Sequence, residues 1–286
     1  MHAFPGTPPA AAHLLTHMLD ALAASGQASR FPVDVADIAL RVSAQFGWKD
    51  PIVDVKAAPI TSFEGGLFTV DGGWVLLYND QIQSEGRIRF TQAHELGHYL
   101  LHRTLRNSFS CTDKDMVEWG PGGKLLEQQA DEFASALLMP INHFRTLVND
   151  SKIDFEMLGK CADLFGVSLT AAALRWVSFT NESAVLVLSR DGYIDWSVSS
   201  DKARKNGAFF RTRGNVIELP AGSLAADSTT ASNKHGMAVG TSVWFEHADG
   251  RAVLREMKIG CDNYGYSLSL LHLSSGDKVW PAWETR

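Results

Sequence analysis

The chain is 286 residues long, 45% of them hydrophobic and 20% charged, with a formal net charge of −6 at pH 7. These fractions are ordinary for a globular protein, and the negative balance excludes a bulk attraction to nucleic acid. A chain of this length is expected to form about two or three domains. Its longest apolar runs are far shorter than the ~20 residues that a membrane-spanning helix needs, so we expect no contact with a membrane.

The sequence also indicates a cellular compartment. Residues 1–9 lack the basic and then apolar order of a secretory signal. The three cysteines, Cys111, Cys161 and Cys261, are odd in number and widely spaced, which argues against a disulfide framework. We therefore expect a cytoplasmic protein, while the sequence leaves its oligomeric state open.

The N-terminal half alternates between helical and extended patterns, which predicts an α+β domain. Helices are expected over residues 10–24, 34–46, 87–103 and 125–138, and strands over residues 52–55, 67–70 and 74–78. Pro140 should end the last of these helices. The apolar strand at 74–78 should lie beside the helix at 87–103, where an extended peptide could pair with its backbone.

Residues 151–179 predict a helix, a turn at Gly166 and a second helix. Such a module could read duplex DNA, or it could simply pack on the preceding domain. Its few basic residues are matched by acidic ones, so it would neutralise phosphates poorly. We favour the packing role.

From residue 184 onward the pattern changes to short strands. Asp191-Gly192 predicts a hairpin between strands at 184–188 and 193–198. Asp249-Gly250 predicts a second hairpin, between strands at 242–246 and 252–257, and a further strand is expected at 266–273. The C-terminal part should therefore be an antiparallel sheet with a few helices.

The most informative motif is His94-Glu95-Leu96-Gly97-His98. Positions i and i+4 share one face of a helix, so His94 and His98 can bind the same zinc ion. Catalytic zinc takes three protein ligands and leaves the fourth position for water. The intervening Glu95 is placed to act as a general base on that water.

A pair of carboxylates further along the chain could supply the third zinc ligand. Glu127 and Asp131 are four residues apart on the expected helix at 125–138. We assign Glu127 to zinc and Asp131 to the outward N–H of a ligating histidine, because such a partner fixes the imidazole tautomer. The alternative is that both carboxylates are solvated helix charges. Their combination with the histidine motif favours the zinc site.

Residues 87–102 and 127–140 together closely resemble the motifs of the ImmA/IrrE metallopeptidases. Members of this family are intracellular enzymes that cut helix-turn-helix repressors and so switch on the genes that those repressors silence. The resemblance implies one zinc ion (Zn2+) per chain, held by His94, His98 and Glu127, with Glu95 as the general base.

The order of the regions after Pro140 is similar to that of the IrrE-like and CapP-like branch of this family. That branch has a zincin-like peptidase domain, a small helix-turn-helix-like module and a GAF-like domain. The resemblance implies domain boundaries at residues 1–148, 149–182 and 183–286, the last being a sensor domain with an antiparallel sheet.

Three further residues are candidates for roles at the site. The tetrahedral oxyanion needs a hydrogen-bond donor, and Tyr78 on the neighbouring strand could supply it, although tyrosines are more often packing residues. His102 lies eight residues after His94 and is expected to be a hydrogen-bonded histidine. Cys111 lies on the loop between the two metal-bearing helices, where its thiolate could occupy the water position and inhibit the enzyme. Replacing Cys111 by Ala would then raise basal proteolysis.

Residues 201–214 carry five basic residues and one acidic residue, interleaved with two phenylalanines. Basic groups that follow phosphates and aromatic rings that stack on bases suit single-stranded DNA. The alternative is a solvated helix and turn whose phenylalanines belong to the core. Resemblance to peptidases that respond to DNA damage favours the DNA interpretation. The candidate residues are Lys202, Arg204, Lys205, Phe209, Phe210, Arg211 and Arg213.

The sequence thus predicts a regulated zinc endopeptidase that cleaves a helix-turn-helix repressor and releases a stress, DNA-damage or anti-phage response, stimulated by single-stranded DNA. The rival hypothesis is a non-proteolytic sensor or transcription regulator in which zinc is structural. Glu95 argues against that rival, because a structural site has no use for a base at this position.

Overall fold

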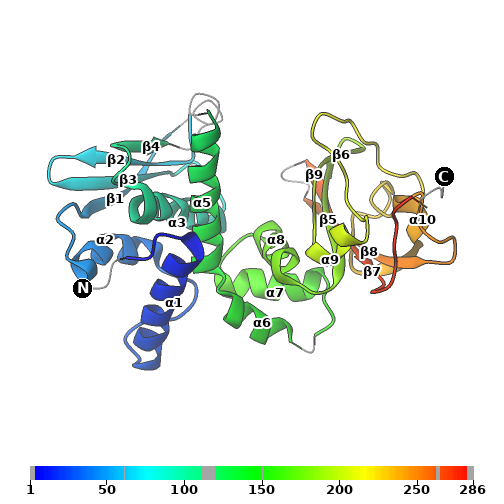
Figure 1. The fold of residues 1–286 in the computed structure, drawn as a ribbon, viewed down its shortest axis with the longest axis horizontal. Helices are drawn as coiled ribbons and strands as arrows, with labels where there is room; N and C mark the ends of the chain where they lie inside the picture. The colour runs from blue at the N-terminus through cyan, green and yellow to red at the C-terminus, as the bar shows by residue number, and fades with distance from the viewer. Residues whose placement is uncertain (1–3, 61, 111–119, 150, 262–264, 282–286) are drawn as a thin grey trace, which may run out of the picture. The chain divides into compact units, whose positions relative to one another are not determined.

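The computed structural model describes residues 4–60, 62–110, 120–149, 151–261 and 265–281. The chain forms two compact units. Unit 1 comprises Met1–Thr146 together with Ala162–Ser168, and unit 2 comprises Leu147–Cys161 together with Leu169–Arg286. Each unit contains one β-sheet (Figure 1), so the expected mixed α+β class is confirmed.

The sheet of unit 1 has the strand order β1-β3-β2-β4. β1 runs parallel to β3, whereas β2 pairs antiparallel with both β3 and β4. The strands are β1 (Ile52–Ala58), β2 (Gly65–Val70), β3 (Gly73–Asn79) and β4 (Ser108–Ser110). The prediction that an extended peptide could pair with the strand at 74–78 is wrong, because β3 lies between two strands and both of its edges are already paired. The outer strands are β1 and β4.

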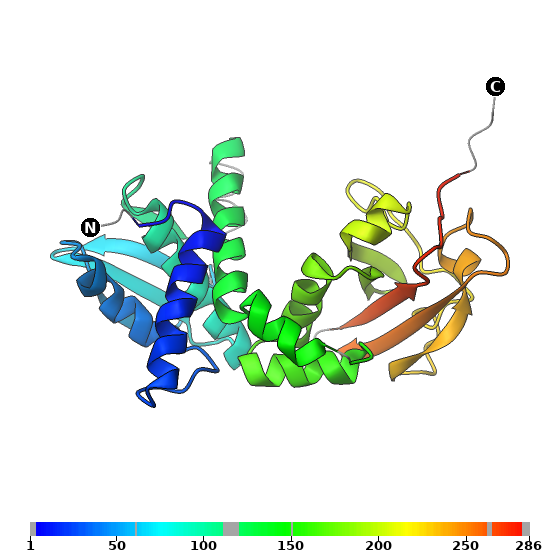
Figure 2. The same ribbon diagram turned by 60° about the horizontal axis from the view of Figure 1, so that its bottom comes forward.

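The helices of unit 1 pack on this sheet and on one another. They are α1 (Pro8–Ala24), α2 (Val35–Phe46), α3 (Glu85–His102) and α5 (Gly120–Leu138), and α6 (Ile141–Val148) follows α5 and ends in unit 2. α3 contacts β2, β3 and α5, and α2 contacts β1. Figure 2 shows α1 lying alongside α5, which it also contacts.

Local capping signals set the starts of two helices. Asp34 accepts a hydrogen bond from the backbone N–H of Asp37 at 3.0 Å and begins α2, as expected. Ser84 accepts from the N–H of Arg87 at 3.3 Å, so α3 begins at Glu85 and not at the predicted residue 87.

A glycine allows α3 and α5 to approach each other closely. A Cβ atom on Gly97 would lie 3.0 Å from a ring carbon of Phe133 and 3.3 Å from the Cα of Ala130. Larger residues at this position would separate the helices. Gly97 lies between the two predicted zinc histidines, so its contact fixes how near they come to α5.

Two helices follow α6. α7 (Phe155–Phe165) and α8 (Leu169–Phe179) meet at an angle of 107°, and Gly166 in the turn has a φ of 62°. This left-handed conformation favours glycine. Among the described residues, no single helix is long and apolar enough to cross a membrane, and only this bent pair reaches such a length and hydropathy when its two helices are taken together.

The sheet of unit 2 is antiparallel throughout, with the strand order β6-β5-β9-β8-β7. The strands are β5 (Ser183–Arg190), β6 (Tyr193–Ser199), β7 (Ser232–Gly240), β8 (Val253–Cys261) and β9 (Tyr266–Leu273). The predicted hairpin at Asp191-Gly192 is confirmed, as is the strand at 266–273.

The predicted strand at residues 242–246 is wrong. The partner of β8 is the earlier strand β7, and residues 241–244 form a short helix, α10 (Thr241–Trp244). The reason is that Trp244 and Phe245 are consecutive and both buried. A strand sends neighbouring side chains to opposite faces, whereas a helical turn can bring both into one core.

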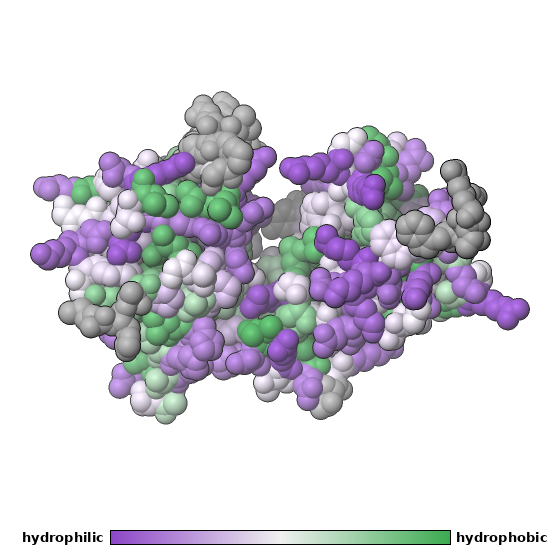
Figure 3. All heavy atoms as spheres, viewed as in Figure 1, coloured by the Kyte–Doolittle hydropathy of each residue, from purple (hydrophilic) through white to green (hydrophobic). Residues whose placement is uncertain are grey.

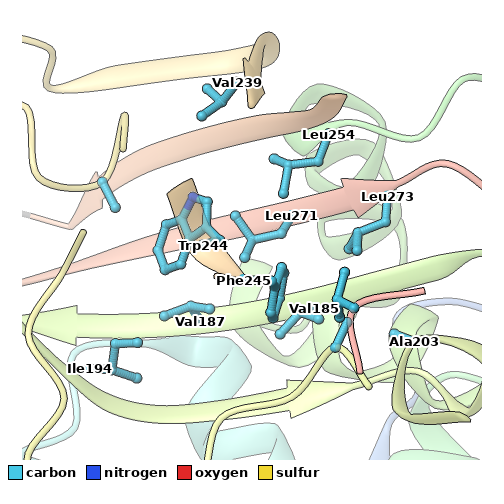
Figure 4. Close-up of a cluster of buried hydrophobic side chains, with 13 residues drawn as sticks. Val185, Val187, Ile194, Ala203, Val239, Trp244, Phe245, Leu254, Leu271 and Leu273 are labelled. Atoms are coloured by element: carbon cyan, nitrogen blue, oxygen red, sulfur yellow. The ribbon is translucent and has the colours of Figure 1, made fainter. Parts of the chain in front are cut away.

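The core on one face of this sheet contains side chains from all five strands together with α10 (Figure 4). Val185 and Val187 of β5 lie beside Leu271 of β9, and Trp244 packs on them. β5 is buried along nearly its whole length. A strand buried on both faces reads as a continuous apolar run, which is what the sequence shows between residues 184 and 188.

Candidate metal centre

Two histidines of α3 and one glutamate of α5 converge in unit 1. His94 Nε2 lies 3.0 Å from His98 Nε2 and 3.1 Å from Glu127 Oε2. His98 Nε2 lies 3.3 Å from Glu127 Oε1. One candidate ligand atom from each residue can be chosen so that all three lie within 4.8 Å of one another. The i, i+4 spacing on α3 and the close contact of α3 with α5 produce this convergence.

The donor set fits zinc. Two imidazole nitrogens and one carboxylate oxygen are the donors of a known type of catalytic zinc site, which leaves one position for water or substrate. All three side chains are buried. Buried polar groups that face one another at these distances are costly unless a proton or a cation lies between them. The cluster could therefore hold a metal ion.

Each histidine has a second partner at its outward nitrogen. His94 Nδ1 lies 2.9 Å from Asp131 Oδ1, the residue that sequence reasoning assigns to this position. His98 Nδ1 lies 3.1 Å from His102 Nδ1, and His102 Nε2 lies 2.9 Å from Gln129 Oε1. Sequence reasoning expects His102 to be hydrogen-bonded, which is confirmed, but it does not identify His98 and Gln129 as the partners. The i, i+4 spacing of His98 and His102 is the signal that could have revealed the first of these contacts.

The protonation states suit metal binding. Burial alone would raise the pKa of Glu127, but its hydrogen bonds with His94 and His98 outweigh that effect and hold its pKa well below the ordinary value. Burial lowers the pKa of His98 to about 4 and also lowers that of His102. At neutral pH the cluster thus offers a carboxylate at Glu127 and a neutral imidazole at His98, the forms that bind metals.

Glu95 lies on α3 next to His94 and is fully buried. Its Oε1 atom faces the start of β2, where a Cβ on Gly65 would be only 3.3 Å away. The same Cβ would be 2.3 Å from the methyl group of Thr91. Gly65 therefore leaves the space into which the carboxylate points. The sequence places Gly65 just before an expected strand but gives no sign that it faces the site.

Tyr78 occupies the strand position opposite Gly65 in the antiparallel pairing of β2 with β3. Residues directly opposite each other in such a pair point to the same face of the sheet. Tyr78 therefore lies on the face that Gly65 presents to Glu95, and it is half-buried. This position is consistent with a donor that turns toward the site.

Phe109 of β4 packs against the cluster of His94, His98 and Glu127. Its ring stacks on the imidazole of His98, with centroids 4.6 Å apart and an angle of 16° between the planes. Phe109 is fully buried. The stack fixes the plane of the His98 ring. Sequence reasoning missed this contact, because the stretch that contains Phe109 is predicted to be a loop.

The other predicted residues belong to unit 2 or lie outside the described residues. Cys111 belongs to the second group, so its proposed contact with zinc stays a hypothesis. The basic segment lies in unit 2, where its two phenylalanines differ. Phe210 stacks on Phe245 of the core at 5.2 Å, whereas Phe209 contacts the half-exposed Trp280. Figure 3 shows hydrophilic residues gathered around α9 (Asp201–Lys205).

An HExxH helix, a carboxylate from a neighbouring helix and a mixed four-stranded sheet together define a domain of the metallopeptidase class. Residues 49–177 match the family model of the IrrE N-terminal-like domain, Peptidase_M78. The match covers both motifs from which the sequence analysis draws its resemblance to this family.

A solved structure shares the fold. A Mycobacterium tuberculosis transcriptional regulator aligns with 91% of this chain and 76% of its own length, at a TM-score of 0.55 and 14% sequence identity. An identity this low shows similarity of fold alone. No curated protein matches the chain in sequence.

Proposed function

We propose that the protein is a regulated zinc-dependent endopeptidase of the cytoplasm that cleaves a helix-turn-helix transcriptional repressor. Cleavage would derepress a stress, DNA-damage or anti-phage operon. The observation that carries the proposal is the convergence of His94, His98 and Glu127 beside the buried Glu95, inside a Peptidase_M78 domain. Peptide-bond hydrolysis is the chemistry that uses three ligands and a base in this order.

Each residue of the site would have a separate role in the reaction. His94, His98 and Glu127 would hold one zinc ion, which acts as a Lewis acid toward the scissile carbonyl and the attacking water. Glu95 would accept a proton from that water and deliver it to the departing amide nitrogen. Asp131 would keep the Nδ1 proton on His94, so that the Nε2 lone pair stays directed into the cluster. Tyr78 would donate a hydrogen bond to the oxyanion.

The substrate segment would bind as an extended strand. Of the two outer strands of the sheet, β4 lies beside the metal cluster, since its Phe109 stacks on His98. An extended peptide that adds to the edge of β4 would gain backbone hydrogen bonds next to the site. β1 is the opposite edge of the same sheet and lies three strands away.

The rest of the chain would regulate the peptidase. We assign residues 149–182 to a helix-turn-helix-like module that packs and does not read duplex DNA, and residues 183–286 to a GAF-like sensor domain. The antiparallel sheet with α9 and α10 supports the second assignment in outline. This sheet has a buried hydrophobic core of its own, as a separate domain requires.

Single-stranded DNA is the proposed activating ligand, and the basic segment of unit 2 is its proposed binding site. Arg204, Arg211 and Arg213 are exposed, and the guanidinium of Arg211 lies 5.7 Å from the ring of Phe209. Phe209 and Trp280 could stack on bases, whereas Phe210 belongs to the core.

Neutralising the cations of this segment should weaken binding of a single-stranded oligonucleotide and reduce its salt dependence. For every phosphate that the protein no longer neutralises, the slope of log K against log [salt] should decrease in magnitude by about 0.7. The measurement is fluorescence anisotropy at several salt concentrations for the wild type and for a variant in which Lys202, Arg204, Lys205, Arg211 and Arg213 are Gln. Equal slopes for the two proteins would remove this segment from the proposal.

The proposed function is tested with the repressor encoded beside the gene. The purified protein is incubated with that repressor, with and without single-stranded DNA, and the products are resolved by mass spectrometry. Cleavage should require zinc, stop after chelation and return when one zinc per chain is restored. Zinc binding without cleavage under every condition would favour the rival sensor without peptidase activity.

A further inference from the structure

Next to the cluster of His94, His98 and Glu127, three polar side chains are hydrogen-bonded in series between α3 and α5. They are His98, His102 and Gln129. The Nδ1 atoms of the two imidazoles are 3.1 Å apart, and His102 Nε2 is 2.9 Å from the side-chain oxygen of Gln129. His98 is completely buried and His102 is 2% exposed, so water cannot readily replace either contact.

The side-chain oxygen of Gln129 sets the direction in which the hydrogen bonds of this series run. The oxygen of Gln129 only accepts hydrogen bonds, so His102 must carry its proton on Nε2. A neutral imidazole then has a lone pair on Nδ1, which can only accept from His98. His98 must therefore carry its proton on Nδ1, and its Nε2 lone pair points toward His94 and Glu127.

If these hydrogen bonds ran in the opposite direction, His98 could not bind a metal ion. If the NH2 group of Gln129 faced His102, each proton along the series would move to the other nitrogen. His98 would then carry its proton on Nε2, the atom that lies 3.3 Å from Glu127. A protonated ring nitrogen has no lone pair for a metal, so this arrangement cannot bind one without a tautomer change.

We propose that His102 and Gln129 are positioning residues that hold His98 in its metal-binding tautomer, an inference that rests on the proposed zinc site. Asp131 has the same task for His94 but is a carboxylate, which can accept only. The two ligating histidines are thus oriented by different means. The tautomer of His98 depends on the orientation of the Gln129 amide, whereas the tautomer of His94 depends on a carboxylate that accepts from either oxygen.

The first test compares two substitutions of His102. His102→Leu removes the acceptor, whereas His102→Asn places a carbonyl oxygen near the former Nδ1 position. Zinc affinity, measured by competition with a chromophoric chelator, should fall about 10- to 100-fold in His102→Leu and recover most of that loss in His102→Asn. Equal affinities for both variants and the wild type would overturn the proposal.

Gln129 provides a second test that does not disturb a fully buried residue. Gln129→Leu should weaken zinc binding, while Gln129→Glu should maintain or strengthen it, because a carboxylate permits only the productive direction. Gln128→Glu is the matched control, since it adds the same charge at an exposed neighbouring position of α5. Loss of affinity in Gln129→Glu would contradict the mechanism, as would an equal gain in Gln128→Glu.

A third test determines the histidine tautomers in the zinc-free protein. Nitrogen-15 NMR of the zinc-free wild type should show the His98 proton on Nδ1 and the His102 proton on Nε2. Protons on the other two nitrogens would overturn the proposal while leaving the peptidase function intact. A wild-type protein that binds no zinc at all would instead overturn the proposed function.

Discussion

Replacing Glu95 by Gln should reduce repressor cleavage by about 10²- to 10⁴-fold while the protein retains one zinc per chain. The amide has nearly the shape of the carboxylate but cannot accept a proton from water. Glu95 lies beside the ligands on α3 and outside the convergent set of His94, His98 and Glu127. Metal content should therefore be unchanged, and only the proton-transfer step should be lost.

The experiment measures the cleavage rate and zinc content of the same preparations. Glu132→Gln is the control, because it makes the same chemical change at an exposed position of α5 and should cleave like the wild type. Wild-type cleavage by Glu95→Gln would contradict the assigned base. Loss of zinc together with activity would mean that Glu95 helps to hold the metal.

How much of this site could be predicted depends on whether the relation between residues is local. The pairs His94 with His98 and Glu127 with Asp131 follow from the repeat of the helix, and the structure places each pair on one side of its helix. A contact between Asp131 and one of the two histidines is also predictable, because ligating histidines need such an acceptor, and the structure shows that the partner is His94.

Other contacts that join separate elements are not predictable in this way, because no general rule of metal chemistry requires them. Phe109 lies in a three-residue strand, and its stack on His98 depends on how β4 pairs with β2. In the sequence Gln129 resembles any other polar helix residue, and only the packing of α5 against α3 brings it to His102. No periodicity within one segment encodes either relation.

The C-terminal sheet shows the same limit. Asp191-Gly192 marks a hairpin because its two strands are joined by a tight turn, and the structure confirms it. Asp249-Gly250 carries the same signal but lies in a longer connection between α10 and β8. There the burial of Trp244 and Phe245 outweighs the local turn preference.

A methyl group added to Gly65 should reduce cleavage at least tenfold without removing zinc. In Gly65→Ala the new carbon would lie 2.3 Å from the methyl carbon of Thr91 and 3.3 Å from Glu95 Oε1. β2 and α3 would have to separate, which moves the base relative to the ligands. Overpacking of this kind also costs about 1–3 kcal/mol of stability.

Thr91→Ser provides the compensating change, because it deletes the clashing methyl carbon and keeps the hydroxyl group. The double variant should recover most of the activity and stability lost in Gly65→Ala, so that the two effects are strongly non-additive. Gly250→Ala is the control, since a Cβ at that position meets nothing within 4 Å.

The measurements are cleavage rate, zinc content and thermal unfolding for all four proteins of the mutant cycle. A Gly65→Ala protein with normal activity would show that the contact between β2 and α3 is loose. Failure of Thr91→Ser to rescue would place the damage elsewhere. Rescue would establish that the space left by Gly65 sets the position of Glu95, the proposed base, a relation that joins a strand to a helix residue 30 positions further along the chain.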